Sequence, residues 1–206
     1  MRLAILGASG HGKVIADAAE QVGWRTITFF DDAWPGLEAN GPWEVRGDTK
    51  ALVANLSCFD GVVVGIGHNR IREEKQSELA KAGAKFAQIV HPSAIISSHA
   101  FIGEGSVVFA NSVVNPCAVL GAGVIVNTGA VVEHDCIVGD FAHISPNAVL
   151  AGGAMVGRKA WVGCCASVRQ LISVGDASVI GMGAVVTKDV ESGVTVVGNP
   201  ARIRHQ

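Results

Sequence analysis

The segment that decides the fold is GAGVIVNTGAVVEHDCIVGDFAHISPNAVL, from Gly121 to Leu150. When it is divided into blocks of six residues, every block ends in Val, Ile or Leu. The same register extends in both directions over 16 consecutive blocks, or hexads, that end between Ile96 and Val186. The fourth place is Ala, Ser or Cys in 14 of these 16 hexads. Each hexad therefore predicts a short strand followed by a tight corner.

Glycine adds a second, longer period to this part of the chain. It recurs every 18 residues, at Gly103, Gly121, Gly139, Gly157 and Gly175. Since 18 residues are three hexads, three strands and three corners are expected to form one triangular coil. This repeat is typical of a left-handed parallel β-helix. A β-sandwich or a purely structural solenoid is the alternative.

The chain before the repeat alternates in type. Apolar runs predict strands at residues 2–6, 26–30, 61–67 and 85–90, and helical spacing predicts helices at 14–22 and 70–83. Strand and helix in alternation indicate a small parallel α/β domain. We therefore expect a Rossmann-like domain over residues 1–90 and an all-β left-handed β-helix domain, with its C-terminal tail, over 91–206.

The net charge, the cysteine count and the lengths of the apolar runs argue against several classes of protein. A net charge of −2 over 206 residues favours neither a nucleic acid nor a membrane surface as partner. Five cysteines without CxxC spacing make a disulfide framework or a zinc site improbable. The apolar start is too short for a signal peptide, and no apolar run reaches membrane length. We expect a soluble, cytoplasmic protein without a metal.

A glycine cluster, GASGHGK from Gly7 to Lys13, follows the first predicted strand and precedes a helix. Backbone N–H groups at such a helix start can hold phosphate. The spacing is GxxGxG rather than GxGxxG, and Val14 replaces the hydroxyl residue of a nucleotide triphosphatase loop.

Two further segments could complete a nucleotide cleft. Asp31 and Asp32 end the second predicted strand, where an acid could bind ribose, although a solvated loop is the alternative. His68, in GIGHNRIR, could line the same cleft together with Asn69 and Arg72. A nicotinamide enzyme would fit this domain but would leave the β-helix without a role.

His134, in VVEHDCIV, is the main candidate for catalysis. It occupies the second place of its hexad, near a corner and directed away from the core, so burial does not explain it. Histidine titrates near neutrality and can take a proton from an attacking amine or hydroxyl. A lone exposed histidine is nevertheless more often inert than catalytic.

Polar and small residues near His134 strengthen this hypothesis. Gly152 lies 18 residues further on, one coil above, where a backbone N–H could polarise an acyl carbonyl. Asn127 and His143 are expected to cluster with His134 within about one coil. Glu133 or Asp135 could orient the imidazole, but neighbours on an extended segment point to opposite faces, so both remain open.

The motifs occur together in one order: GASGHGK, the Asp31–Asp32 pair, GIGHNRIR, VHPSA, NTGAVVEHDC, HISPNAVLAGG and GNPAR. With this combination the chain resembles the PglD/NeuD group of hexapeptide-repeat sugar acetyltransferases over nearly its whole length. The resemblance implies a nucleotide-sugar-binding first domain, a β-helix that binds acetyl-CoA, and a homotrimer with active sites between subunits. It is greatest to members that acetylate the 4-amino group of a UDP-sugar in bacillosamine synthesis.

The resemblance also implies roles for individual residues. The base falls on His134 and its orienting acid on Asp135, where PglD-like sequences read EHE; Asn127 is a polar active-site residue. The residues implied to bind acetyl-CoA are His143, Gly152, Cys164 and Met182. The residues implied to bind the UDP-aminosugar are Ser9, Gly10, His11, Gly12, Asp31, Asp32, Asn69 and Arg72. No metal is implied.

The expected function is acetyl-CoA-dependent N-acetylation of a UDP-linked 4-amino sugar. O-acetylation of sialic acid or another sugar is the alternative within the same class. A non-catalytic trimer that binds a sugar nucleotide is the alternative of another class. The sequence leaves open the nucleotide, the sugar, the acetylated position and the pathway.

Overall fold

The computed structural model describes residues 1–204 and divides into two compact units. Unit 1 comprises residues 1–92, and unit 2 begins at Ser93. The predicted fold class is confirmed: an α/β unit with a parallel sheet precedes a parallel β-helix.

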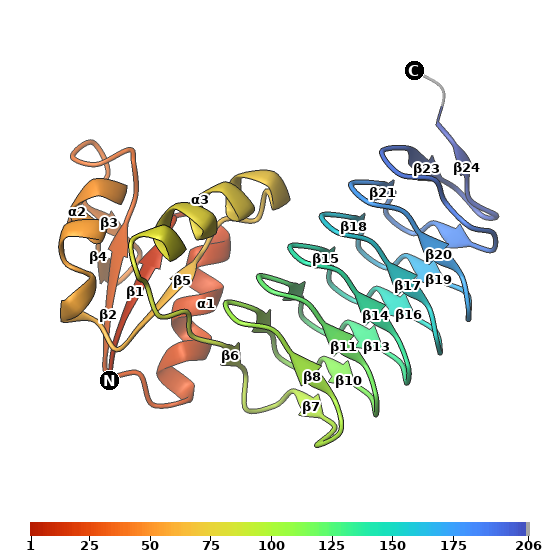
Figure 1. The fold of residues 1–206 in the computed structure, drawn as a ribbon, viewed down its shortest axis with the longest axis horizontal. Coiled ribbons are helices and arrows are strands. Elements are labelled where there is room, and N and C mark those ends of the chain that lie inside the picture. Colours follow the sequence, from red (N-terminus) through yellow and green to blue (C-terminus); the bar gives the residue numbers. More distant parts are fainter. Residues whose placement is uncertain (205–206) are drawn as a thin grey trace. The chain divides into compact units, whose positions relative to one another are not determined.

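Unit 1 is built on a parallel sheet with the strand order β2-β1-β5 (Figure 1). The strands are β1 (Arg2–Leu6), β2 (Thr26–Phe30) and β5 (Gly61–Val64). The helices are α1 (Gly10–Gln21), α2 (Thr49–Ala54) and α3 (Asn69–Lys81), with a short 3₁₀ helix at Leu56–Cys58. The remaining strands are β3 (Ala39–Asn40) and β4 (Trp43–Glu44), which form a hairpin, and β6 (Ile89–Val90).

Apolar side chains cover both faces of this sheet. Ala4 and Leu6 pack in one cluster with Leu52 of α2 and Leu79 of α3. The alternate residues of β1 point to the opposite face, where α1 contributes buried Ile15 and several alanines. Helices on both faces are what the alternating sequence predicts.

The structure differs from the prediction in the short elements of unit 1. Only β6 and an isolated bridge between Phe86 and Val62 form in the segment expected to be a strand over 85–90. Helix α2 and the β3–β4 hairpin were not predicted, because segments of two to six residues are too short to establish a period.

Unit 2 contains three parallel sheets that form the faces of a triangular β-helix, and Figure 1 shows its strands following one another coil by coil. The first face holds β7 (Ile95–Ile96), β10 (Val113–Val114), β13 (Val131–Val132), β16 (Val149–Leu150), β19 (Ser167–Val168) and β22 (Val185–Val186). The second face holds β8 (Phe101–Ile102), β11 (Val119–Leu120), β14 (Ile137–Val138), β17 (Met155–Val156) and β20 (Ser173–Val174). The third face holds β9 (Val107–Val108), β12 (Ile125–Val126), β15 (His143–Ile144), β18 (Trp161–Val162), β21 (Val179–Ile180), β23 (Thr195–Val197) and the antiparallel β24 (Arg202–Ile203).

Three columns of corners join these faces, and we name each by a residue in it. The His134 corner joins the first and second faces, and the Asn127 corner joins the third and first faces. The glycine corner, which contains Gly139, joins the second and third faces. In every column the third residue of the corner has a positive φ from Gly105 to Gly183, so the chain turns sharply there.

The glycine corner explains the period of 18 residues. The glycines that recur every 18 residues occupy the first place of this corner, and none of them has a positive φ. Conformational freedom is therefore not the reason for them. A Cβ on Gly139 would lie 2.6 Å from the backbone N of Arg158 and 2.9 Å from the carbonyl carbon of Gly157. The coils therefore approach too closely at this corner for any side chain.

Replacing Gly139 by Ala is expected to destabilise unit 2. The added methyl group meets the backbone of the next coil, which cannot move aside as a side chain could. We expect the free energy of unfolding to fall by about 1–3 kcal/mol. Chemical unfolding followed by circular dichroism measures it. Gly10→Ala, where the added Cβ meets no atom within 4 Å, is the control. An unchanged unfolding midpoint in Gly139→Ala would contradict the steric explanation.

Candidate functional site

His134 lies at the corner between β13 and β14. Val132 before it and Val138 after it are buried in the core, and Cys136 fills the inside of the corner. The His134 side chain is 62% exposed, as its second place in the hexad predicts. The corner thus keeps the apolar pattern of the repeat and holds an imidazole outside it.

Asp135 is the carboxylate that contacts this imidazole. Its Oδ2 lies 2.7 Å from Nδ1 of His134. Asp135 has a φ of 61°, in the left-handed region, so the chain bends between the two residues and their side chains meet. The expectation that these neighbours point to opposite faces assumed an extended segment and is wrong at this corner.

Glu133 turns to a different partner. Its Oε2 accepts a hydrogen bond of 2.9 Å from Nδ2 of Asn115, one coil earlier. The same oxygen lies 3.4 Å from the backbone N of His134. Glu133 therefore adds negative charge near the ring but makes no hydrogen bond to the ring nitrogen that Asp135 contacts.

The two carboxylates favour the protonated form of His134. The hydrogen bond that Nδ1–H of His134 donates to Asp135 is the largest cause. Together with the charges of Asp135 and Glu133 it outweighs partial desolvation and raises the pKa of His134 above its ordinary value of 6.5. A carboxylate on Nδ1 also fixes the proton of the neutral ring there. Nε2 is then the nitrogen that can accept a proton.

Replacing Asp135 by Asn is expected to change the pH dependence of the enzyme. A base must be neutral to act, so activity falls on the acid side as pH drops through the raised pKa of His134. Without the carboxylate this acidic limb moves to lower pH. An amide also tolerates the tautomer with the proton on Nε2, so kcat falls by roughly 10- to 100-fold.

The pH profile of kcat/KM measures this effect. Glu133→Gln is the matched control, since it removes a nearby charge without removing the hydrogen bond to Nδ1, and its limb should move less. An acidic limb in Asp135→Asn at the wild-type position would show that Asp135 does not act on the ring.

Gly152 lies directly above His134 in the next coil. The N–H of Gly153 donates a 2.9 Å hydrogen bond to the carbonyl of His134, which fixes the two coils in register. A Cβ on Gly152 would lie 2.6 Å from both Cε1 and Nε2 of His134. The glycine therefore leaves the space that the reactive edge of the imidazole occupies.

Asn127 and His143 meet each other at the Asn127 corner. Nδ2 of Asn127 lies 3.1 Å from Nε2 of His143, and His143 is only 9% exposed. Strand β13 separates this corner from His134. The expected cluster of all three residues within one chain is thus not formed, because nine residues along this repeat lead to another face.

Cys164 and Met182 extend the Asn127 corner towards the C-terminus. The N–H of Gly183, next to Met182, donates a 2.8 Å hydrogen bond to the carbonyl of Cys164. Met182 is strongly exposed, and Cys164 is partly exposed. Of the residues expected to bind acetyl-CoA, Cys164 and Met182 therefore lie in the Asn127 column, His143 lies on the adjoining third face, and Gly152 lies in the His134 column.

The glycine cluster of unit 1 forms the turn between β1 and α1. Ser9 is the N-cap residue of α1, and a Cβ on Gly10 would meet no atom within 4 Å. Gly12 packs against the carbonyl of Gly7 and the ring of Phe29, so no side chain fits there. The N–H groups at the start of α1 thus lie beside open space at the carboxyl edge of the sheet, where α/β units bind ligands.

His11, the second residue of α1, is partly buried. Its burial and the charge of Arg72 lower the pKa of His11 from 6.5 to about 4. The imidazole is therefore neutral near pH 7 and contributes no cation to a phosphate site.

Asp31 and Asp32 have structural partners in unit 1. Asp31 accepts hydrogen bonds from the N–H groups of Ala8 (2.7 Å) and Ala33 (2.9 Å), which ties the end of β2 to the glycine turn. Asp32 binds Thr49 and Lys75. Burial alone would raise the pKa of Asp32, but the hydrogen bonds from Lys75 and Thr49 outweigh it and lower the pKa to about 2.

Arg72 points into unit 1 rather than to its surface. Its guanidinium donates to the carbonyls of Ile66 and Gly67, each at 3.0 Å, and to Oδ1 of Asn69 at 2.9 Å. The residue is 1% exposed, and this burial lowers the pKa of Arg72 to about 9. Arg72 thus holds the loop between β5 and α3 in place, which differs from the expected direct contact with the ligand.

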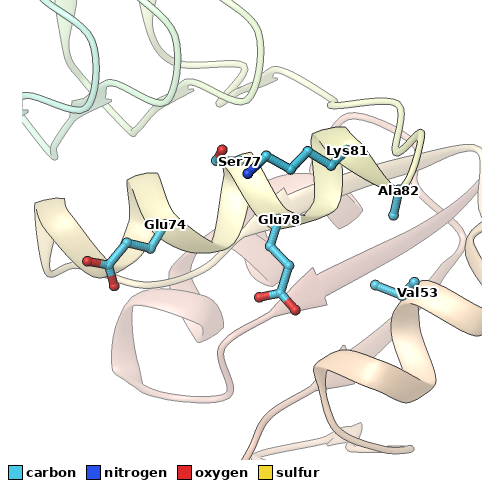
Figure 2. Close-up of a pocket in the computed structure, with 6 residues that line it drawn as sticks. All are labelled: Val53, Glu74, Ser77, Glu78, Lys81 and Ala82. Carbon is cyan, nitrogen blue, oxygen red and sulfur yellow. The ribbon is translucent and has the colours of Figure 1, made fainter.

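A hollow of about 570 Å³ between α2 and α3 contains none of these residues. Figure 2 shows its lining, which consists of Val53, Glu74, Ser77, Glu78, Lys81 and Ala82. Two carboxylates against one lysine would repel a phosphate. The hollow therefore has no part in the candidate site.

The described residues, 1–204, also bear on the expectations about membranes and metals. No helix in this range is long and apolar enough to cross a membrane. The same residues contain no group of three or more His, Cys, Asp and Glu side chains placed to hold a metal ion.

Sequence reasoning missed two residues that contact the candidate site. Trp161 stacks on His143, and Asn115 binds Glu133. Each lies 18 residues from its partner, which is the one signal in the sequence that could have indicated the contact.

The chain thus combines a parallel β-helix with an exposed His–Asp pair at one of its corners. Residues 2–79 match the model of the PglD N-terminal domain family. The acetyltransferase domain of PglB from Neisseria gonorrhoeae, solved also with acetyl coenzyme A, is 40% identical; the match covers 98% of this chain and 99% of that chain with a TM-score of 0.93. The chain belongs to the PglD-like family of sugar N-acetyltransferases.

Two further relatives are associated with different sugar nucleotides, one GDP-linked and the other UDP-linked. PerB from Caulobacter crescentus, solved with CoA and GDP-perosamine, is 32% identical, with coverage of 100% of this chain and 98% of that chain and a TM-score of 0.95. UDP-N-acetylbacillosamine N-acetyltransferase of Bacillus subtilis is 37% identical over 111 residues, or 52% of this chain. That match spans about half (51%) of the curated relative's length.

Proposed function

We propose that this protein transfers the acetyl group of acetyl-CoA to the 4-amino group of a UDP-linked amino sugar, as in bacillosamine synthesis. The observation that carries the proposal is the His134–Asp135 pair, whose accepting nitrogen lies below Gly152. Two relatives support acetyl-CoA and an amino-sugar nucleotide as the substrate classes, since one was solved with acetyl coenzyme A and the other with CoA and GDP-perosamine. A third relative is named as an N-acetyltransferase of a UDP-linked sugar.

The reaction needs one base and one oxyanion donor. The neutral 4-amine attacks the thioester carbonyl, and Nε2 of His134 takes the proton that the amine loses as the C–N bond forms. Asp135 stabilises the resulting imidazolium. The N–H of Gly152 helps to hold the oxyanion. When the C–S bond breaks, the imidazolium returns the proton to the CoA thiolate.

The nucleotide part of the substrate is assigned to unit 1. The turn that contains Ser9, Gly10 and Gly12 offers N–H groups to the phosphates. Asp31, Asp32 and Arg72 support this site by fixing its loops, and Asn69 is the first residue of α3, directly after one of those loops. His11 completes the wall of the turn as a neutral ring.

A homotrimer is part of the proposal. One chain carries His134 at one corner and Asn127, Cys164 and Met182 at another, with His143 beside Asn127 on the third face. A second copy must therefore bring its Asn127 corner to His134 if these groups are to act together. The second face supports such an assembly, because it carries a row of apolar side chains that are between 42% and 61% exposed. These are Phe101, Val119, Ile137 and Met155.

We place the reaction in the cytoplasm. The cysteines of the described residues are all free thiols, which fits a reducing compartment. Acetyl-CoA serves as co-substrate, and the chemistry requires no metal.

The test is thiol release from acetyl-CoA with a panel of acceptors: UDP-, GDP- and CMP-linked amino sugars and free sialic acid. We expect turnover with the UDP-4-amino sugar and a mass of three chains by light scattering. Preference for a GDP-linked sugar would overturn the nucleotide assignment, and acetylation of a hydroxyl would overturn N-acetylation. Binding of a nucleotide sugar without thiol release would favour a non-catalytic protein.

A further inference from the structure

Trp161 and His143 form a stacked pair on the third face. Trp161 lies one coil above His143, in register on β18 and β15. Their ring centroids are 5.8 Å apart, and the ring planes differ by only 4°. His143 is nearly buried, whereas Trp161 is 49% exposed. An aromatic ring therefore covers the imidazole from the C-terminal side.

A second contact fixes the indole. Nε1–H of Trp161 donates a 2.7 Å hydrogen bond to Oγ of Ser145, which is buried. Ser145 follows β15 directly, so it belongs to the same strand and corner as His143. The indole is thus attached to the coil below it both through its ring face and through its N–H.

The hydrogen bonds around Asn127 determine the tautomer of His143. Oδ1 of Asn127 accepts a 2.9 Å hydrogen bond from the backbone N–H of Thr128, so its Nδ2 group is the one that faces His143. Since Nδ2 is a donor, Nε2 of His143 must accept. The ring is then neutral and carries its proton on Nδ1.

We propose that Trp161 is a positioning residue of the acyl-donor site, which keeps His143 in the neutral Nδ1–H form that Asn127 requires. A ring that tilted out of its present plane would carry Nε2 away from the Nδ2 group of Asn127 and lose that hydrogen bond. The stack holds the plane of the imidazole, and the bond to Ser145 holds the indole, so both oppose this tilt. The conclusion that this affects the acyl donor rests on the proposed role of His143 in binding acetyl-CoA.

This arrangement makes His143 a hydrogen-bond donor through a single nitrogen. A neutral imidazole held in one tautomer has one fixed donor and one fixed acceptor and brings no charge to the acyl donor. Loss of the stack should therefore weaken acetyl-CoA binding and leave proton removal by His134 unaffected.

Two variants of the protein separate the contributions of the indole. Trp161→Phe keeps an aromatic face and loses the N–H, and Trp161→Leu loses both. We expect KM for acetyl-CoA to rise by about 2- to 10-fold in Trp161→Leu and by less in Trp161→Phe, with kcat within about twofold of wild type. Trp43→Phe is the control, because it removes an indole N–H that binds a side chain, Glu20, in unit 1.

The tautomer is read directly by NMR of protein with ¹⁵N-labelled histidine, with the His143 signals assigned by their loss in His143→Phe. We expect Nδ1–H and unprotonated Nε2 signals in the wild type and in Trp43→Phe, and averaged signals in Trp161→Leu. A fixed tautomer in Trp161→Leu, or a fall in its kcat with unchanged KM, would overturn the proposal. If the wild type neither binds CoA nor releases thiol, the proposed function fails, while the NMR result still decides the role of Trp161.

Discussion

Replacing His134 by Ala is expected to lower kcat by a factor of about 10² to 10⁴, the usual contribution of a positioned general base. Glu133, the neighbouring carboxylate, does not take its place, because it is bound to Asn115. The substitution removes an exposed side chain, so the unfolding midpoint should not change. Steady-state kinetics with acetyl-CoA and the accepted amino sugar measure the loss.

His99→Ala is the matched control. His99 is an exposed histidine in the same column of corners, two coils before His134, where the carbonyl of His99 accepts a hydrogen bond from Cys117. Its loss should leave kcat unchanged. Turnover by His134→Ala close to the wild-type rate would show that this imidazole is not the base.

Replacing Gly152 by Ala is expected to lower kcat by roughly 10- to 100-fold, although the change adds one methyl group far from the core. Its Cβ would lie 2.6 Å from Cε1 and Nε2 of His134, so the exposed imidazole must move away from Asp135 or from the acceptor. A surface ring moves at little cost, so stability should change little. The backbone N–H of residue 152 is kept, so this loss measures the position of the ring.

A double variant tests whether the effect of Gly152→Ala acts through His134. In a protein that already lacks the imidazole, the added methyl group has nothing to displace. Gly152→Ala should therefore cause no further loss in the His134→Ala background. Losses that multiply would indicate that the methyl group blocks the acyl donor or the oxyanion site instead.

The hexad pattern was sufficient to predict the β-helix, because each coil repeats the same packing problem. The aliphatic sixth place and the small fourth place correspond to buried positions such as Val132 and Cys136. The glycine period was visible in the sequence, but its cause was not: it is the close approach of successive coils at Gly139 and its equivalents.

The candidate site was predicted less completely, for two geometric reasons. The choice between Glu133 and Asp135 depended on the positive φ of Asp135, and the residue type at this position does not by itself predict that φ. The separation of His134 from Asn127 and His143 depended on which corner each residue reaches, and distance along the chain does not measure that.

Unit 1 shows a different limit of sequence reasoning. Asp31 and Arg72 occupy places where charged residues could bind a nucleotide, yet their side chains bind the backbone of the loops around the glycine turn. Whether a charge faces the ligand or supports the loop depends on one rotamer, and the sequence pattern is the same in both cases.

The most direct test of the central claim is a crystal structure of the protein with CoA and the UDP-linked 4-amino sugar bound together. The distance that decides is the one between the 4-amino nitrogen and Nε2 of His134. We expect about 2.6–3.2 Å, with the ring still bound to Asp135. An amine placed beyond the reach of this imidazole, and against a different base, would contradict the assignment of His134.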